Sequence, residues 1–289
     1  MKVPPSAAPR ACPRMTPVTS GNSPGRRPGW RGEERSMPHA RSNGHRIAYE
    51  VDGEGPLLLL HPGMFQTGAG WAAFGYTEIL RKSHTVVAVD PLGLGASDAP
   101  GEPAAYALER RAESVLAVLD DLGADRAAVW GYSMGALTVL GLVRYAPERC
   151  ERVVAGAWDP VEGFASAVRH ELRLHRLPAD TDPYGLLLQV AYADPGSAAV
   201  CEAASPAALR ANYEAFSRDR GLDAALVASP LPTLLYCGTE DPWHEPMRET
   251  ARRAGAEFLS LPGADHQAGW ARSGEVLAGV LPFLAADRM

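Results

Sequence analysis

Residues 127–137 constrain the fold of this chain more than any other stretch. An apolar run leads into Gly131-Tyr132-Ser133-Met134-Gly135 and then passes directly into an apolar helical pattern. A Gly-x-Ser-x-Gly segment between a strand and a helix is typical of a nucleophile elbow, a sharp turn that presents the serine hydroxyl. The two glycines leave room in a turn that is too tight for Cβ atoms. The stretch therefore predicts an exposed, activated Ser133 at the end of a strand.

The rest of the chain alternates between short apolar runs of strand length and helical patterns, which favours a mostly parallel α/β sheet with helices on both faces. We expect strands at the elbow and over residues 45–51, 57–60, 85–89, 152–158, 232–237 and 256–261. We expect helices from the elbow to residue 145 and over residues 71–81, 105–122, 245–254 and 275–285. Folds of this kind carry their sites at the carboxyl ends of the strands.

Two segments interrupt this alternation and divide the chain. Residues 1–40 are basic, rich in Pro, Arg, Ser and Gly, and without apolar periodicity, so we expect a disordered leader. Residues 161–228 lack strands and predict a helical cap, with helices over 164–177, 185–193 and 207–220. The α/β core then comprises residues 41–160 and 229–289. Met37 is an alternative start, so the sequence leaves open whether residues 1–36 belong to the natural protein.

Charge and cysteine content narrow the class of protein. The net charge is −6, and the basic leader means that the remainder is more acidic still. An acidic body argues against nucleic acid or an anionic membrane as a partner. The four cysteines show no Cys-x-x-Cys spacing, which favours a reduced, cytoplasmic protein with no disulfide framework and no metal site. We expect no cofactor and a small-molecule substrate, and a homo-oligomer stays open.

Three polar residues follow expected strands in the order Ser133, Asp241, His266, which is the chain order that accompanies this elbow. His266 would accept the serine proton during attack and return it to the leaving group. Asp241 would hold the imidazole tautomer and stabilise its charged form. Asp159 also follows a strand and is the alternative acid.

An oxyanion formed on the substrate needs two N–H donors. Met134, the residue after the nucleophile, supplies one. The loop His61-Pro62-Gly63-Met64 follows an expected strand and supplies the other. Pro62 has no N–H, so the second donor is Gly63 or Met64.

Residues 44–286 resemble the α/β-hydrolase superfamily. The resemblance rests on five segments: 61–64, 90–98, 131–135, 238–242 and 263–266. It implies a mostly parallel eight-stranded sheet with a helical cap inserted after the strand that ends at Asp159. Two residues depart from the common pattern. His-Pro-Gly replaces the commoner His-Gly, and Leu92 stands where many members have an arginine.

A serine nucleophile indicates acyl transfer, because the relatives that open epoxides or carbon–halogen bonds use aspartate. We therefore expect a serine esterase-like hydrolase that cleaves a carboxylic ester, lactone or thioester of a small-to-medium, largely apolar substrate. Two alternatives remain: a non-hydrolytic biosynthetic step such as cyclisation or elimination, and ligand binding on a hydrolase fold. The expected cap carries six apolar residues that either line the pocket or, as we favour, form the cap's own core: Phe164, Leu172, Leu186, Leu187, Leu188 and Phe216. Three arginines recur on one helix face, for which we favour a solvated surface over contacts with an anionic substrate: Arg169, Arg173 and Arg176.

Overall fold

The computed structural model describes residues 37–286. The predicted disorder of the leader concerns residues that lie almost entirely outside this range. The sheet comprises β1 His39–Ser42, β2 His45–Asp52, β3 Leu57–His61, β4 Thr85–Val89, β5 Ala127–Tyr132, β6 Cys150–Gly156, β7 Thr233–Gly238 and β8 Glu257–Leu261. The α-helices outside the segment 161–228 are α1 Ala69–Ala73, α2 Tyr76–Leu80, α3 Leu108–Asp121, α4 Met134–Tyr145, α10 His244–Ala254, α11 His266–Ala271 and α12 Ser273–Ala285, and the short 3₁₀ helices are Pro103–Tyr106 and Pro147–Arg149.

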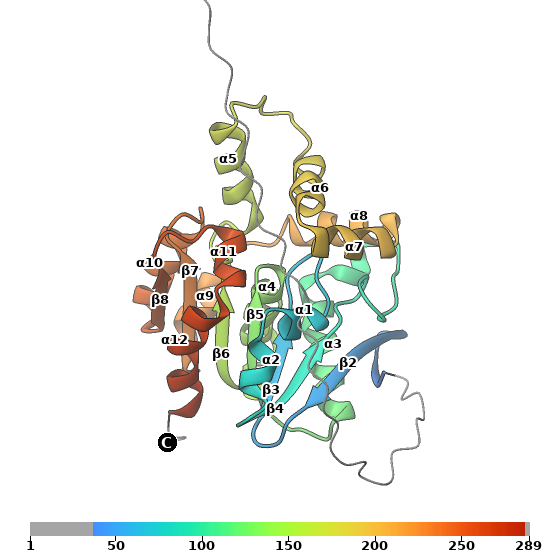
Figure 1. Cartoon of the computed structure of the whole chain (residues 1–289), viewed down its shortest axis with the longest axis vertical. Helices are drawn as coiled ribbons and strands as arrows, with labels where there is room; N and C mark the ends of the chain where they lie inside the picture. The colour runs from blue at the N-terminus through green and yellow to red at the C-terminus, as the bar shows by residue number, and fades with distance from the viewer. Residues whose placement is uncertain (1–36, 287–289) are drawn as a thin grey trace, which may run out of the picture. The chain divides into compact units, whose positions relative to one another are not determined.

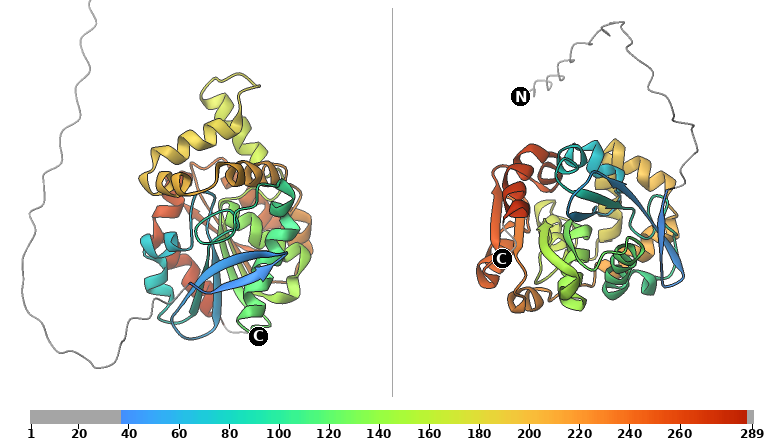
Figure 2. Two further views of the ribbon diagram at one scale, coloured as in Figure 1. Left: turned by 90° about the vertical axis from the view of Figure 1, so that its right-hand side faces the viewer. Right: turned by 90° about the horizontal axis from the view of Figure 1, so that it is seen from below.

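The eight strands form one sheet in the order β1-β2-β4-β3-β5-β6-β7-β8 (Figure 1). Strands β1 and β2 pair antiparallel, as do β2 and β4, whereas all other neighbours are parallel. The central strand β5 is buried at every residue, as expected for a strand covered on both faces. Helices α1, α2, α11 and α12 lie on one face of the sheet, and α3, α4 and α9 lie on the other (Figure 2). The predicted mostly parallel α/β sheet with eight strands is confirmed.

The boundary that we expect for the leader at residue 40 is wrong by two residues, because β1 begins at His39. This strand pairs with β2 through a hairpin whose turn is Asn43-Gly44, with φ values of 50° and 83°. Asn-Gly is the preferred pair for such a turn, because both residues tolerate positive φ. The predicted helix over residues 71–81 is two short helices, α1 and α2, since Gly75 between them has a φ of 81°.

The segment 161–228 lies between β6 and β7 and contains five helices rather than three. They are α5 Phe164–Leu174, α6 Pro183–Ala193, α7 Pro195–Ala203, α8 Pro206–Phe216 and α9 Asp223–Ala228. Helices α5 to α8 lie over the carboxyl ends of the parallel strands (Figure 1). Helices α6, α7 and α8 each begin with a proline that follows a side chain capping the first turn, namely Asp182, Asp194 and Ser205.

No helix within residues 37–286 combines the length and the apolar character that are needed to cross a bilayer. Three of the four cysteines, Cys150, Cys201 and Cys237, are buried as free thiols, and Cys12 lies outside the described residues.

Candidate active site

The turn after β5 holds Ser133 in a backbone conformation that is uncommon for a residue with a side chain, with φ 55° and ψ −119°. A Cβ atom on Gly131 would lie 2.0 Å from the carbonyl oxygen of Gly135, and one on Gly135 would lie 2.0 Å from that of His61. Only glycine fits at either position without displacing the backbone. The Ser133 N–H donates to the Gly156 carbonyl over 2.8 Å, which ties the turn to β6.

Ser133, His266 and Asp241 form one chain of hydrogen bonds. His266 Nε2 lies 3.1 Å from Ser133 Oγ, and His266 Nδ1 lies 2.7 Å from Asp241 Oδ2. Because a carboxylate oxygen only accepts, Nδ1 carries the proton and donates it to Asp241. In a neutral ring Nε2 is then unprotonated, so it accepts the hydrogen bond of the serine hydroxyl. This is the tautomer that can act as a general base.

The surroundings of Asp241 and His266 fix both side chains. The side chain of Asp241 is fully buried, and its second oxygen accepts the N–H of Trp243 over 3.0 Å. The Trp243 ring meets the imidazole edge-on, with ring centroids 5.1 Å apart. On another side, the Tyr132 ring lies 5.3 Å from the imidazole centroid.

The structure does not bring the alternative acid, Asp159, to the histidine. Its Oδ1 accepts the backbone N–H groups of Val161 and Glu162 over 2.8 and 3.2 Å. Asp159 therefore shapes the turn that leads from β6 into the helical segment.

Three further polar residues make hydrogen bonds that do not involve Ser133, His266 or Asp241. Asp265 caps α11 by accepting the N–H of Ala268, and His244 hydrogen-bonds Ser260. Asp98 pairs with Arg46, whose N–H and guanidinium hold the pKa of that carboxyl below its usual value.

The loop after β3 lies directly against the nucleophile. A Cβ on Gly63 would be 3.3 Å from the Cβ of Ser133, and Met64 lines the cavity above it. The Gly63 N–H donates to Gln66 Oε1 over 3.2 Å, a contact that the sequence did not predict. His61 is buried and donates from Nδ1 to the Pro62 carbonyl, and burial lowers its pKa to about 4. His61 is thus a neutral residue that organises the loop. Met134, the first residue of α4, has an N–H without an intrahelical partner.

A cavity of about 890 Å³ opens above Ser133 and His266 and is lined mainly by α5, α6 and the strand ends. We favoured a core role for six apolar residues of this segment over a pocket lining, but four of them line the cavity: Phe164, Leu186, Leu187 and Phe216. Leu172 and Leu188 do not line it, and neither do the three arginines. Arg169 pairs instead with Glu162 at the surface, which agrees with the solvated face that we favoured over a contact with an anionic substrate.

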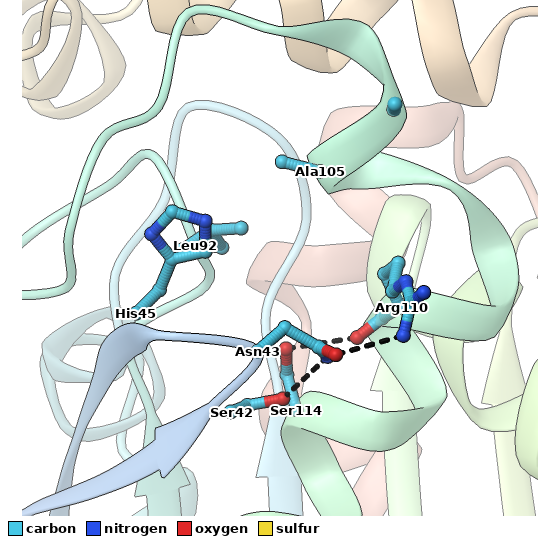
Figure 3. A pocket seen from close by; sticks show the side chains of 8 residues that line it. Ser42, Asn43, His45, Leu92, Ala105, Arg110 and Ser114 are labelled. Atoms are coloured by element: carbon cyan, nitrogen blue, oxygen red, sulfur yellow. Dashed lines mark hydrogen bonds between the residues drawn. The ribbon is translucent and has the colours of Figure 1, made fainter.

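A second hollow lies between the β1–β2 hairpin, the start of α3 and the preceding 3₁₀ turn (Figure 3). It shares no lining residue with the cavity at Ser133. Its polar groups bind one another: Arg110 donates to Asn43 over 2.7 Å and pairs with Glu113, and Asn43 donates to Ser42. In the part of the chain that the structure describes, no three His, Cys, Asp or Glu side chains gather as ligands for a metal ion.

Comparison with known proteins agrees with this architecture. Residues 56–169 match a family model described as the alpha/beta hydrolase fold. A putative carbamate hydrolase, RutD, from Azorhizobium caulinodans is 30% identical over 129 residues, which are 44% of this chain and 47% of that protein. The chain thus spans about half the length of the curated relatives that it matches.

Two solved structures are similar over most of the chain. A hydrolase from Pseudomonas aeruginosa PA01 is 29% identical with a TM-score of 0.70, covering 88% of this chain and 100% of its own. The enol-lactonase from Burkholderia xenovorans LB400 is 28% identical with a TM-score of 0.69, covering 86% of this chain and 99% of its own. Together with the sheet order and the turn at Ser133, these findings place the chain in the α/β-hydrolase superfamily.

Proposed function

We propose that this protein is a cofactor-independent serine hydrolase that cleaves acyl bonds through an acyl-serine intermediate. The hydrogen-bonded chain from Asp241 through His266 to Ser133, at the floor of a largely apolar cavity, carries the proposal. The hydrolase names of the relatives support the same reaction class.

The geometry supports a two-step reaction. Ser133 Oγ attacks the substrate carbonyl carbon while His266 Nε2 takes the hydroxyl proton. The imidazolium then gives that proton to the leaving oxygen or sulfur, the acyl–heteroatom bond breaks, and the acyl group remains on Ser133. Water attacks this ester, His266 again takes and returns a proton, and the acid leaves with Ser133 regenerated. Asp241 stabilises the imidazolium in both steps.

The negative oxygen of each tetrahedral intermediate needs donors that are already oriented. The Met134 N–H is the first, because it lies at the N-terminus of α4, where the helix dipole also favours negative charge. The second comes from the loop at Gly63 and Met64. We favour Gly63, because its backbone lies against Ser133 and its N–H already points at an oxygen acceptor, Gln66 Oε1.

The cavity lining favours an uncharged, apolar acyl or alcohol group. Aliphatic and aromatic side chains dominate the wall formed by α5 and α6. Among the described residues that line the cavity, the charged ones are carboxylates, Glu171, Glu240, Asp241 and Asp265, and no Lys or Arg is among them. An anionic substrate would meet like charge in a partly desolvated site. Esters, lactones and thioesters of medium-sized neutral acids are therefore the proposed substrates. The names of two similar proteins, an enol-lactonase and a putative carbamate hydrolase, also denote carbonyl compounds.

The experiment is a panel of p-nitrophenyl esters from acetate to decanoate, with the monoester of adipate as the anionic counterpart of hexanoate. We expect hydrolysis that peaks at medium chain length, at least about 10-fold lower kcat/KM for adipate, and at least about 10³-fold loss in Ser133→Ala. Leu187→Trp narrows the cavity and should shift the optimum to shorter chains. Hydrolysis by Ser133→Ala at the wild-type rate would contradict the proposed mechanism.

A further inference from the structure

Tyr132 immediately precedes the candidate nucleophile and has no part in the proposed proton transfers. Its side chain is buried, with 2% of its surface exposed, and it does not line the cavity. Its hydroxyl donates a hydrogen bond of 2.6 Å to the backbone carbonyl of His266. The ring lies 5.3 Å from the His266 imidazole and also packs against Tyr236 and Trp270, which restrict its movement.

These contacts form a closed loop of covalent and hydrogen bonds around the candidate catalytic pair. The loop runs from Ser133 to Tyr132 through one peptide bond, and from the Tyr132 hydroxyl to the His266 carbonyl. It continues through the His266 side chain and returns from Nε2 to Ser133 Oγ over 3.1 Å. A tyrosine side chain has only two rotatable bonds to its ring, so it acts as a stiff spacer. The position of His266 relative to Ser133 is thus set by one side chain as well as by the fold.

The space around this contact is tight. A Cβ atom on Gly269, one turn along α11 from His266, would lie 2.7 Å from the Tyr132 hydroxyl. Gly269 therefore lets α11 approach the hydroxyl closely. Helix α11 has six residues and starts at His266; Asp265 caps its first turn, and the Tyr132 hydroxyl holds the carbonyl of the same His266.

We propose that Tyr132 is a positioning residue that sets the distance between Ser133 Oγ and His266 Nε2 by holding the His266 carbonyl. The proposal rests on the proposed serine hydrolase function. Tyr132 acts through His266 and does not touch the substrate. Because an error of about 1 Å in the placement of reacting groups costs about 100-fold in rate, loss of this hydroxyl should slow the chemical step without weakening substrate binding.

The test compares Tyr132→Phe with Tyr76→Phe. The Tyr76 hydroxyl is also buried and also donates to a backbone carbonyl of α11, that of Trp270, over 2.8 Å. Both variants lose one such bond and should lower the melting temperature by a similar amount. We expect Tyr132→Phe to lower kcat and the rate of phosphonylation of Ser133 by about 10- to 100-fold, with KM within about 2-fold. Tyr76→Phe should stay within about 3-fold of wild type in both rates.

A double-mutant cycle identifies the route of the effect. If Tyr132 acts through His266, adding Tyr132→Phe to His266→Ala should change the residual rate by less than about 2-fold. A further loss of about 10-fold in that background would overturn the proposal, as would equal activity of Tyr132→Phe and Tyr76→Phe. Failure of the wild-type protein to hydrolyse any ester would instead reject the proposed function, whereas an active wild type with an unimpaired Tyr132→Phe rejects only the role of Tyr132.

Discussion

Replacement of Asp241 by Asn tests which carboxylate supports His266. The amide keeps the size of the side chain, and its oxygen can still accept the N–H of Trp243. Its NH₂ group, however, would face the protonated Nδ1 that Asp241 Oδ2 now accepts over 2.7 Å. The imidazole would relieve that clash by carrying its proton on Nε2 instead of Nδ1. A protonated Nε2 can no longer accept the proton of Ser133.

Two effects set the expected size of the loss. The imidazolium formed during attack loses an opposite charge, and unit charges about 4 Å apart attract by about 4 kcal/mol at an effective dielectric constant of about 20. That energy corresponds to about 10³-fold in rate. The wrong tautomer adds to this loss, so we expect kcat for an ester to fall by about 10³- to 10⁴-fold. Serine proteases lose about 10⁴-fold in kcat when the aspartate of their triad is replaced by asparagine, which is a loss of the same size.

The matched control is Asp159→Asn. Asp159 accepts two backbone N–H groups, and an asparagine oxygen can accept them as well. The kcat of Asp159→Asn should therefore stay within about 5-fold of wild type, with a small loss of stability. The assay is steady-state hydrolysis of p-nitrophenyl butyrate, with circular dichroism to confirm folding. If Asp159→Asn lost more than Asp241→Asn, the assignment of the acid would be reversed.

Two further predictions concern stability. Gly135→Ala places a methyl group 2.0 Å from the His61 carbonyl and should destabilise the fold by about 1–3 kcal/mol or more in urea unfolding, whereas Gly274→Ala, where a Cβ meets nothing within 4 Å, should not. A destabilised Gly274→Ala with an unaffected Gly135→Ala would refute this reasoning. Burial lowers the pKa of His61 from 6.5 to about 4, so the folded state resists a proton that the unfolded chain binds. The neutral His61 therefore contributes about 3 kcal/mol to the free energy of unfolding above pH 6.5, and this contribution is lost as the pH falls to 4. His61→Gln should flatten the fall of unfolding free energy between these pH values, and an unchanged slope would show that His61 does not contribute.

Local features of the sequence predict the central part of the fold. The elbow glycines, the apolar strands and their alternation with helices depend on neighbouring residues, and the structure agrees with them. We did not predict the hairpin at Asn43-Gly44, although its turn carries a strong local signal. We also did not predict α7, although Asp194-Pro195 marks its start with the same N-cap and proline pair as Ser205-Pro206 at the start of α8.

Contacts between distant residues cannot be predicted in the same way. Asp159 and Asp241 both follow strands, and nothing in their neighbours shows that one binds backbone while the other faces His266. The bond from Tyr132 to the His266 carbonyl joins residues 134 apart and depends on how α11 packs over β5. The side of segment 161–228 that faces the cavity likewise depends on the placement of α5 and α6. The sequence therefore could not decide which of its apolar residues line the cavity, as Leu187 does, and which do not, as with Leu172.

The most direct test of an activated Ser133 is its reaction with a fluorophosphonate probe, followed by intact mass and peptide mapping. The proposed mechanism predicts a single adduct on Ser133, none in Ser133→Ala, and labelling slowed at least about 10²-fold in His266→Ala. A folded wild-type protein that acquires no adduct would contradict the mechanism. Labelling of His266→Ala as fast as that of the wild type would contradict it as well.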